Sequence, residues 1–314
     1  MAKKQKRPEG EFERPIRRAP PDPGDSTTAP PTESASLEST SLESTSLESA
    51  SGEVGPLNRR VKLAFGAALA IGLLVLAGNW FLDRRLKPEP DAWPDTDLGA
   101  DEVQIYKDTD TRPLHLHLFL PAGASPRSAK PGVVFFHGGG LSRTPLDQFV
   151  PQAEALRAQG LVVAIAEYRV LHDGGTPESS LSDAADAVAW LRSEGAELGV
   201  DPNRVAASGA SAGGWLAADT ALGSGPPPDA LVLFNPAVNR TEAPSADIPI
   251  IVFHGDADTT VDLSRAEGYC DAAQDCRIDI WPGGNHGFFN AVHPEAHAHT
   301  TAEMIAFLEG LGWI

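Results

Sequence analysis

The chain lacks two kinds of motif that bind cofactors. It has no glycine-rich phosphate-binding loop, and its histidines form no convincing metal-binding motif. His293, His297 and His299 include an i, i+4 pair, but the solvated start of a helix explains this spacing better than a metal site does. We therefore expect neither a metal nor another cofactor.

Basic residues are scarce in the part of the chain that follows residue 87. Residues 88–314 contain 12 Lys and Arg but 32 Asp and Glu, in a chain whose formal net charge is −18. A domain this acidic repels nucleic acids and anionic polymers, so we expect neither as a partner. The charge suits a neutral substrate.

Cysteine is also rare, with two in the chain. Cys270 and Cys276 are close enough in sequence to join the end of a helix to the start of a strand, which would suit an oxidising compartment. Two unrelated free thiols fit the sequence nearly as well. Both alternatives stay open at this point.

The first part of the chain is polar, proline-rich and repetitive. Within residues 1–58, a pentapeptide recurs with starts at Ser36, Ser41 and Ser46. A period of five matches neither a helix nor a strand, so the segment has no face that it can bury. We expect a disordered tail.

An apolar segment at residues 61–82 follows this tail. About 20 residues that rise 1.5 Å each span the roughly 30 Å hydrocarbon layer of a bilayer. We therefore expect a single transmembrane signal anchor, then a linker at 83–100 and a globular domain at 101–314. Basic residues flank both ends of the segment equally, but single N-terminal anchors commonly leave a large C-terminal domain outside. We expect the domain to be periplasmic or extracellular.

The most informative motif is Gly-Ala-Ser-Ala-Gly at residues 209–213. It lies between a short apolar run at 204–208 and a run at 215–222 that is rich in helix-forming residues. A serine at such a strand-to-helix turn has a strained backbone and an exposed hydroxyl, and the flanking glycines remove side chains that would clash. The pattern predicts a nucleophile elbow with Ser211 as the nucleophile.

A second glycine-rich motif, His-Gly-Gly-Gly at residues 137–140, follows the strand-like run 132–136. Successive glycines let backbone N–H groups approach a substrate carbonyl without an intervening side chain. Together with the N–H of Ala212, they can form an oxyanion hole.

The acid and base partners of the serine are expected further along the chain. His286 lies on a loop after the last strand-like run, where it can take the proton of the serine. A cluster of carboxylates follows the run 249–253, and spacing alone does not choose among Asp256, Asp258 and Asp262. The order serine, acid, histidine is that of α/β-hydrolases.

With these elements the chain resembles an α/β-hydrolase of the HGGG-type esterase group, which includes the hormone-sensitive-lipase-like enzymes and bacterial feruloyl and acetyl esterases. The resemblance covers roughly residues 101–314. It implies that Ser211 is the nucleophile, that His286 is the general base and acid, and that Asp258 orients the histidine. The oxyanion donors that it implies are the backbone N–H groups of Gly139, Gly140 and Ala212.

The hydrophobic pattern predicts a mostly parallel, eight-stranded sheet with helices on both faces. Strands are expected at 103–107, 114–120, 132–136, 161–166, 204–208, 230–234, 249–253 and 277–281. Helices are expected near 148–159, 179–198, 212–222, 262–273 and 295–310. The segments where the family builds its cap are short here, so we expect a minimal cap and an open, shallow site.

These features predict a serine carboxylic-ester hydrolase that acts on short-chain or aromatic esters, including esters on carbohydrates. Trp215, Phe288 and Phe289 are the side chains expected to contact the substrate. Two alternatives remain: an amide-cleaving relative (a peptidase or formamidase), and a membrane-tethered binding protein on an inactive hydrolase scaffold. The oligomeric state stays open.

Overall fold

The computed structural model describes the C-terminal two thirds of the chain. The described residues are 97–314, with the exception of 224, 239–242 and 245–246. The chain divides into two units, Met1–Ala70 and Ile71–Ile314, and every described residue belongs to the second.

The N-terminal predictions fall on residues that the structure does not describe. The disordered tail expected at 1–58 and the membrane span expected at 61–82 both lie outside the described residues. Within residues 97–314, none of the described helices is both long enough and apolar enough to cross a membrane. Leu98 is buried in the core, so the packed domain begins slightly before the predicted boundary at residue 101.

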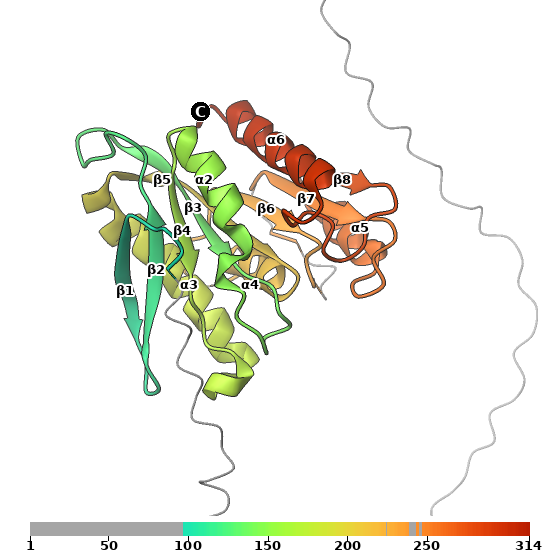
Figure 1. The fold of residues 1–314 in the computed structure, drawn as a ribbon, viewed down its shortest axis with the longest axis horizontal. Coiled ribbons are helices and arrows are strands. Elements are labelled where there is room, and N and C mark those ends of the chain that lie inside the picture. Colours follow the sequence, from blue (N-terminus) through green and yellow to red (C-terminus); the bar gives the residue numbers. More distant parts are fainter. Residues whose placement is uncertain (1–96, 224, 239–242, 245–246) are drawn as a thin grey trace, which may run out of the picture. The chain divides into compact units, whose positions relative to one another are not determined.

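An eight-stranded sheet forms the centre of the described domain (Figure 1), with the strand order β1-β2-β4-β3-β5-β6-β7-β8. The strands are β1 Glu102–Asp108, β2 Pro113–Phe119, β3 Lys130–Phe136, β4 Val162–Ala166, β5 Val200–Ala210, β6 Ala230–Phe234, β7 Ile250–Gly255 and β8 Cys276–Trp281. β2 runs antiparallel to both of its neighbours, β1 and β4, and every other neighbouring pair is parallel. The predicted mostly parallel sheet of eight strands is confirmed.

Helices cover both faces of this sheet. One face packs against α2, Val150–Ala158, and α6, Pro294–Gly310. The other face packs against α3, Pro177–Ser193, α4, Ala212–Thr220, and α5, Leu263–Ala272. Because β4, β6 and β7 are covered on both sides, all of their residues are buried, which is why the sequences of these strands are continuous apolar runs.

Short 3₁₀ helices complete the connections. They are η1 Leu146–Phe149, η2 Leu171–Asp173 and η3 Glu194–Leu198. η1 leads directly into α2, and η3 continues α3 toward β5. The single helices expected near 148–159 and 179–198 are therefore each a 3₁₀ segment joined to an α-helix.

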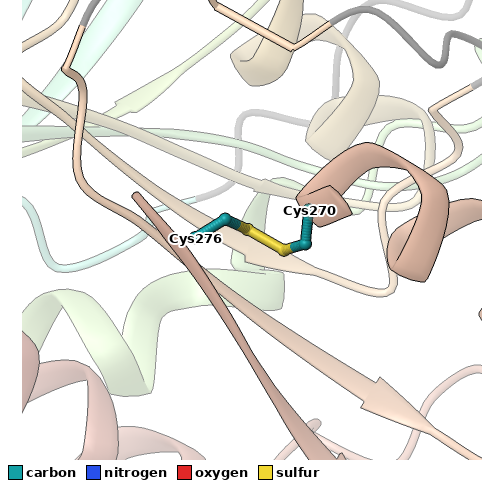
Figure 2. The surroundings of a disulfide bond; sticks show 2 residues. All are labelled: Cys270 and Cys276. Atoms are coloured by element: carbon teal, nitrogen blue, oxygen red, sulfur yellow. A yellow bond between two sulfur atoms is a disulfide. The ribbon is translucent and has the colours of Figure 1, made fainter. Parts of the chain in front are cut away.

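The two cysteines form a disulfide bond between the last turn of α5 and the start of β8 (Figure 2). The Cα atoms of Cys270 and Cys276 lie 5.1 Å apart. Of the two alternatives that the sequence left open, the structure has the bridged pair.

The parallel strands determine where a site can form, because their carboxyl ends meet at one edge of the sheet. Strands β3, β5, β6, β7 and β8 all end at this edge. The loops that follow them carry, in that order, His137, Ser211, Asn235, Asp258 and His286. Residues separated by up to 149 positions are thus brought to one place.

Candidate active site

Ser211 occupies the sharp turn between β5 and α4, with φ 53° and ψ −117°. A positive φ is strained for a residue with a side chain, so the surrounding structure must hold it in place. The glycines on either side leave no room for a Cβ. At Gly213 it would overlap the carbonyl oxygens of Phe136 and His137, and at Gly209 it would overlap the backbone of Gly213.

Backbone hydrogen bonds hold the turn in this conformation. The N–H of Ser211 donates to the carbonyl of Phe234 at 3.0 Å. Its own carbonyl accepts from the N–H groups of Trp215 at 3.0 Å and Ala237 at 2.9 Å. Strand β6, the loop after it and helix α4 therefore all fix the direction of the Ser211 hydroxyl.

His286 contacts both Ser211 and Asp258. Its Nε2 lies 2.9 Å from Ser211 Oγ, and its Nδ1 lies 2.7 Å from Asp258 Oδ2. An ionised carboxylate only accepts hydrogen bonds, so Nδ1 carries the proton and Nε2 accepts from the serine hydroxyl. This is the arrangement in which an imidazole can take a proton from the serine while the carboxylate orients it.

Asp258 is held in its ionised form. Its side chain is fully buried, and burial alone would raise its pKa. Hydrogen bonds from His286 and from the backbone N–H groups of Thr260, at 2.8 Å, and Val261, at 3.0 Å, outweigh this effect. The pKa of Asp258 therefore lies below its usual value, and the carboxylate stays charged at neutral pH.

The two other candidate carboxylates have different contacts. Asp256 accepts a hydrogen bond from the N–H of Gly283 at 2.6 Å. Asp262 caps α5, because its side chain accepts from the N–H of Ser264 at 2.9 Å. Of the three, Asp258 is the one that the structure brings to His286.

The glycine-rich segment 137–140, called the oxyanion loop here, contains two left-handed residues, Gly139 with φ 111° and Gly140 with φ 64°. The N–H of Gly138 donates to Gln148 Oε1 at 2.7 Å and is therefore occupied. Within the described residues, the N–H groups of Gly139, Gly140 and Ala212 donate to no acceptor. Ala212 begins α4, where backbone N–H groups lack an acceptor in the helix and favour negative charge.

His137, the first residue of the oxyanion loop, anchors the loop in the core. It is fully buried, and its ring stacks on that of Tyr168 with 4.4 Å between the ring centroids. The hydroxyl of Tyr168 donates to the His137 carbonyl at 2.8 Å. Burial lowers the pKa of His137 to about 4, so the ring is neutral at physiological pH and serves to hold the loop.

A cavity of about 510 Å³ opens over these groups. Ser211, His286 and the three glycines of the oxyanion loop line it. Of the three side chains expected to contact substrate, Phe289 lines this cavity. Trp215 and Phe288 do not: Trp215 packs against the core on the α3/α4 face, and Phe288 is 3% exposed within the core on the opposite face. Their hydrophobicity reflects packing in the core.

Several polar residues of the site were not predicted from the sequence. Asn235, which has φ 36°, places its amide nitrogen 3.1 Å from His286 Nδ1 and 3.3 Å from Nε2. Its position directly after a buried strand was a usable signal. Gln148, Asn290 and Arg143 also line the cavity, but no local pattern distinguishes them, because their contacts depend on the tertiary fold.

The histidines near the start of α6 make separate contacts. His297 Nδ1 lies 3.1 Å from the carbonyl of Phe289, and His299 Nε2 lies 3.0 Å from Asp279 Oδ2. His293 precedes the first residue of the helix. In the part of the chain that the structure describes, no group of three or more His, Cys, Asp or Glu side chains is arranged to hold a metal ion.

The sheet, the strained serine turn and the histidine on the last loop define an α/β hydrolase, and the chain belongs to that family. A sequence model of the alpha/beta hydrolase fold matches residues 133–257. The apo structure of Thermogutta terrifontis esterase 2 is 30% identical, covers 70% of this chain and 97% of that one, and superposes with a TM-score of 0.64. The butyrate-bound structure of that esterase has the same identity and a TM-score of 0.63, with 69% and 96% of the two chains covered.

Carboxylesterase NlhH from Mycobacterium tuberculosis is 34% identical over 137 residues. These residues cover 43% of this chain and 41% of that protein, so the chain matches less than half the length of this relative. The resemblance to the HGGG-type esterases is confirmed by these relatives, which place the chain among the carboxylesterase-type hydrolases.

Proposed function

We propose that the protein is a serine carboxylesterase that works through an acyl-enzyme. The observation that carries this proposal is the unbroken hydrogen-bond chain from Asp258 through His286 to Ser211, which opens onto a cavity of about 510 Å³. The adjacent backbone N–H groups that lack an acceptor within the described residues supply the second requirement, a place for developing negative charge.

In the proposed mechanism, Ser211 Oγ attacks the ester carbonyl while His286 Nε2 takes the hydroxyl proton. The carbonyl oxygen becomes an oxyanion, and each well-aimed N–H donor stabilises it by about 3–4 kcal/mol in the transition state. The donors are those of Gly139, Gly140 and Ala212. His286 then protonates the leaving alcohol, and the bond between the carbonyl carbon and that alcohol breaks.

Deacylation repeats these steps with water. His286 Nε2 removes a proton from the water that attacks the acyl-enzyme, and the collapse of the second tetrahedral intermediate returns that proton to Ser211. Asp258 stabilises the imidazolium in both halves of the cycle because its carboxylate remains ionised. The products are a carboxylic acid and an alcohol.

The substrates we propose are esters of short-chain or aromatic acids, including esters on carbohydrates. The short connection between β6, which ends at Phe234, and β7, which begins at Ile250, supports an open site with little cap. The related esterase 2 has been crystallised with butyrate, which is a short acyl chain. A long-chain triglyceride would gain little from such a site.

We further propose that residues 61–82 anchor the protein in a membrane with the catalytic domain outside the cytoplasm. The disulfide between Cys270 and Cys276 supports this location, because disulfides persist in oxidising compartments. Protease treatment of spheroplasts, in which the outer barrier is removed and the inner membrane stays intact, tests it. Digestion of the domain without lysis is expected, and protection until lysis would contradict the orientation.

The activity is tested by the hydrolysis of p-nitrophenyl esters from acetate to palmitate, by the protein and by its Ser211→Ala variant. We expect turnover of acetate that falls with chain length and is lost in the variant. An anilide of the same acyl group, assayed in parallel, separates esterase from amidase activity. Turnover of palmitate alone, or ester turnover that survives Ser211→Ala, would contradict the proposal.

A further inference from the structure

The cavity above Ser211 differs in charge from the domain around it. Although acidic residues greatly outnumber basic ones in residues 88–314, no Asp or Glu lines the cavity among the described residues. One permanently charged side chain does line it, that of Arg143. The side chains that line the cavity therefore include one cationic group and no anionic one, while the ionised Asp258 lies behind His286.

Arg143 is held next to the oxyanion loop. Its N–H donates to the carbonyl of Gly139 at 3.2 Å, and the N–H of Ser142 donates to the same carbonyl at 3.1 Å. The backbone of Arg143 also packs so closely on Gly139 that a Cβ at Gly139 would lie 2.5 Å from the Arg143 carbonyl oxygen. The start of the arginine side chain is therefore fixed beside the proposed oxyanion donors.

The guanidinium of Arg143 pairs with no carboxylate of the described residues, and the residue is exposed. This contrasts with most other arginines of the domain. Those that form an ion pair with Asp or Glu are Arg112, Arg157, Arg169, Arg192, Arg204 and Arg277. In so acidic a domain, an arginine that lines the cavity and keeps its donors unpaired within the described residues is available to a ligand.

We propose that Arg143 binds an anionic group of the substrate, so that the preferred esters carry a carboxylate on the acyl or the alcohol side. This inference rests on the proposed esterase function and names its substrate class. A guanidinium binds a carboxylate through two parallel N–H···O bonds, which no other lining side chain offers. The acidic surface does not prevent this, because charges more than about 8 Å away are largely screened at physiological salt.

The proposal changes an expectation that came from composition. The net charge of residues 88–314 predicts a preference for neutral substrates, because it describes the average field of the domain. Selectivity at the reacting ester depends on the side chains that contact the substrate, and the permanently charged one among those that line the cavity is Arg143. An ester of a sugar acid, or of an aromatic acid with a second carboxyl group, has the required chemistry.

The test compares two pairs of esters, each with one anionic and one neutral member. In the first pair the carboxylate is on the leaving group: 4-acetoxybenzoate against 4-acetoxybenzamide. In the second it is on the acyl group: monophenyl adipate against phenyl hexanoate. The measured quantity is the ratio of kcat/KM for the anionic member to that for the neutral member, in the full-length protein and its variants.

Differences in intrinsic reactivity between the members of a pair cancel when the ratio of a variant is divided by that of the wild type. We expect Arg143→Gln to lower the ratio about fivefold in at least one pair, the range of a solvent-accessible ion pair. Arg143→Lys, which keeps the charge, is expected to retain most of the preference, and Arg143→Glu to lower the ratio further. The effect of Arg143→Gln should shrink in about 0.5 M NaCl, because salt at this concentration strongly screens exposed charges.

Arg127→Gln is the matched control. Arg127 is exposed but lies before β3, at the amino end of the strand and away from the cavity, so the same change of charge should leave both ratios at the wild-type value. The pair that responds to Arg143→Gln identifies the side of the ester that carries the carboxylate. Unchanged ratios in both pairs would overturn the role of Arg143 while leaving the esterase proposal intact. Failure of the wild type to hydrolyse any of the four esters would overturn both.

Discussion

Gln148 and Asn290 form a hydrogen bond, from Gln148 Nε2 to Asn290 Oδ1 at 3.2 Å, that joins the two loops flanking Ser211. Each residue also holds the backbone of one loop. Gln148 Oε1 accepts from the N–H of Gly138 at 2.7 Å, and Asn290 Nδ2 donates to the carbonyl of Gly287 at 3.0 Å. The oxyanion loop and the segment next to His286 are thus fixed relative to each other.

The Gln148–Asn290 link predicts that Gln148→Met lowers kcat about 10- to 100-fold, with a smaller change in KM. Methionine fills a similar volume but neither accepts from Gly138 nor donates to Asn290, and small displacements of catalytic groups have costs of about this size. Steady-state kinetics on p-nitrophenyl acetate measure the effect. Gln159→Met, at the exposed end of α2, is the control and should keep wild-type kinetics. A variant with normal kcat and raised KM would show that Gln148 contacts substrate instead.

The tight packing of the serine turn predicts opposite outcomes for two glycine substitutions. Gly213→Ala places a Cβ against the backbone carbonyl oxygens of Phe136, the last residue of β3, and His137. Because this backbone cannot move away, we expect a loss of about 3 kcal/mol or more in stability. In Gly268→Ala, the new Cβ meets nothing within 4 Å, and the residue lies inside α5. There alanine should stabilise the protein by up to about 1 kcal/mol. Urea unfolding measures both, and equal effects would contradict the packing argument.

Glu167, at the end of β4, forms a buried ionic contact away from the active site. Arg112 Nη1 lies 2.5 Å from its Oε2, and His117 Nε2 lies 3.2 Å from its Oε1. Burial would raise the pKa of Glu167, but the hydrogen bond with His117 and the charge of Arg112 lower it to about 2, from a usual value of 4.5. A carboxylate whose pKa is lower in the folded state stabilises the protein above its unfolded pKa, and the contribution is lost as the pH falls.

We therefore expect Glu167→Gln to reduce the free energy of unfolding by about 3 kcal/mol at pH 7, because each tenfold change in proton affinity corresponds to about 1.4 kcal/mol. The difference from wild type should hold down to about pH 4.5 and shrink progressively toward pH 2. Denaturant unfolding across this range measures it. Glu309→Gln, on the exposed side of α6, should follow the wild-type curve throughout. A difference that does not vary with pH would mean that Glu167 acts through packing and not through its charge.

Much of the site was predictable because its backbone conformation requires glycine at particular positions, and these glycines are visible in the sequence. The turn at Ser211 needs glycines at 209 and 213, where a Cβ would overlap the backbone. The oxyanion loop needs glycine at 139 and 140 because both have a positive φ. Such positions restrict residue type strongly enough to be recognised without a structure.

The strands at the centre of the sheet were predictable for a related reason. Strands covered by helices on both faces must be apolar along their whole length, and the turns that bound them are rich in Gly, Pro and Asp. The ends of helices were harder, because a 3₁₀ segment such as η1 and the α-helix after it share one hydrophobic pattern.

Contacts between side chains from distant segments left no such mark. Nothing local shows that Gln148 reaches Asn290, 142 positions away, or that Arg143 lines the cavity. Trp215 lies four residues after the nucleophile and looked like a substrate contact. Its side chain is instead half-buried and packs against the edge of the core on the α3/α4 face of the sheet.

The most direct test of the account is covalent labelling of Ser211. A phosphonofluoridate reacts with a serine only when an adjacent base activates the hydroxyl and the oxyanion site accepts the phosphoryl oxygen. We predict one adduct per chain by intact mass, located on Ser211 by peptide mapping, with its formation strongly slowed in His286→Ala. Labelling at another residue, or at Ser211 with the same rate in His286→Ala, would contradict the proposed roles of both residues.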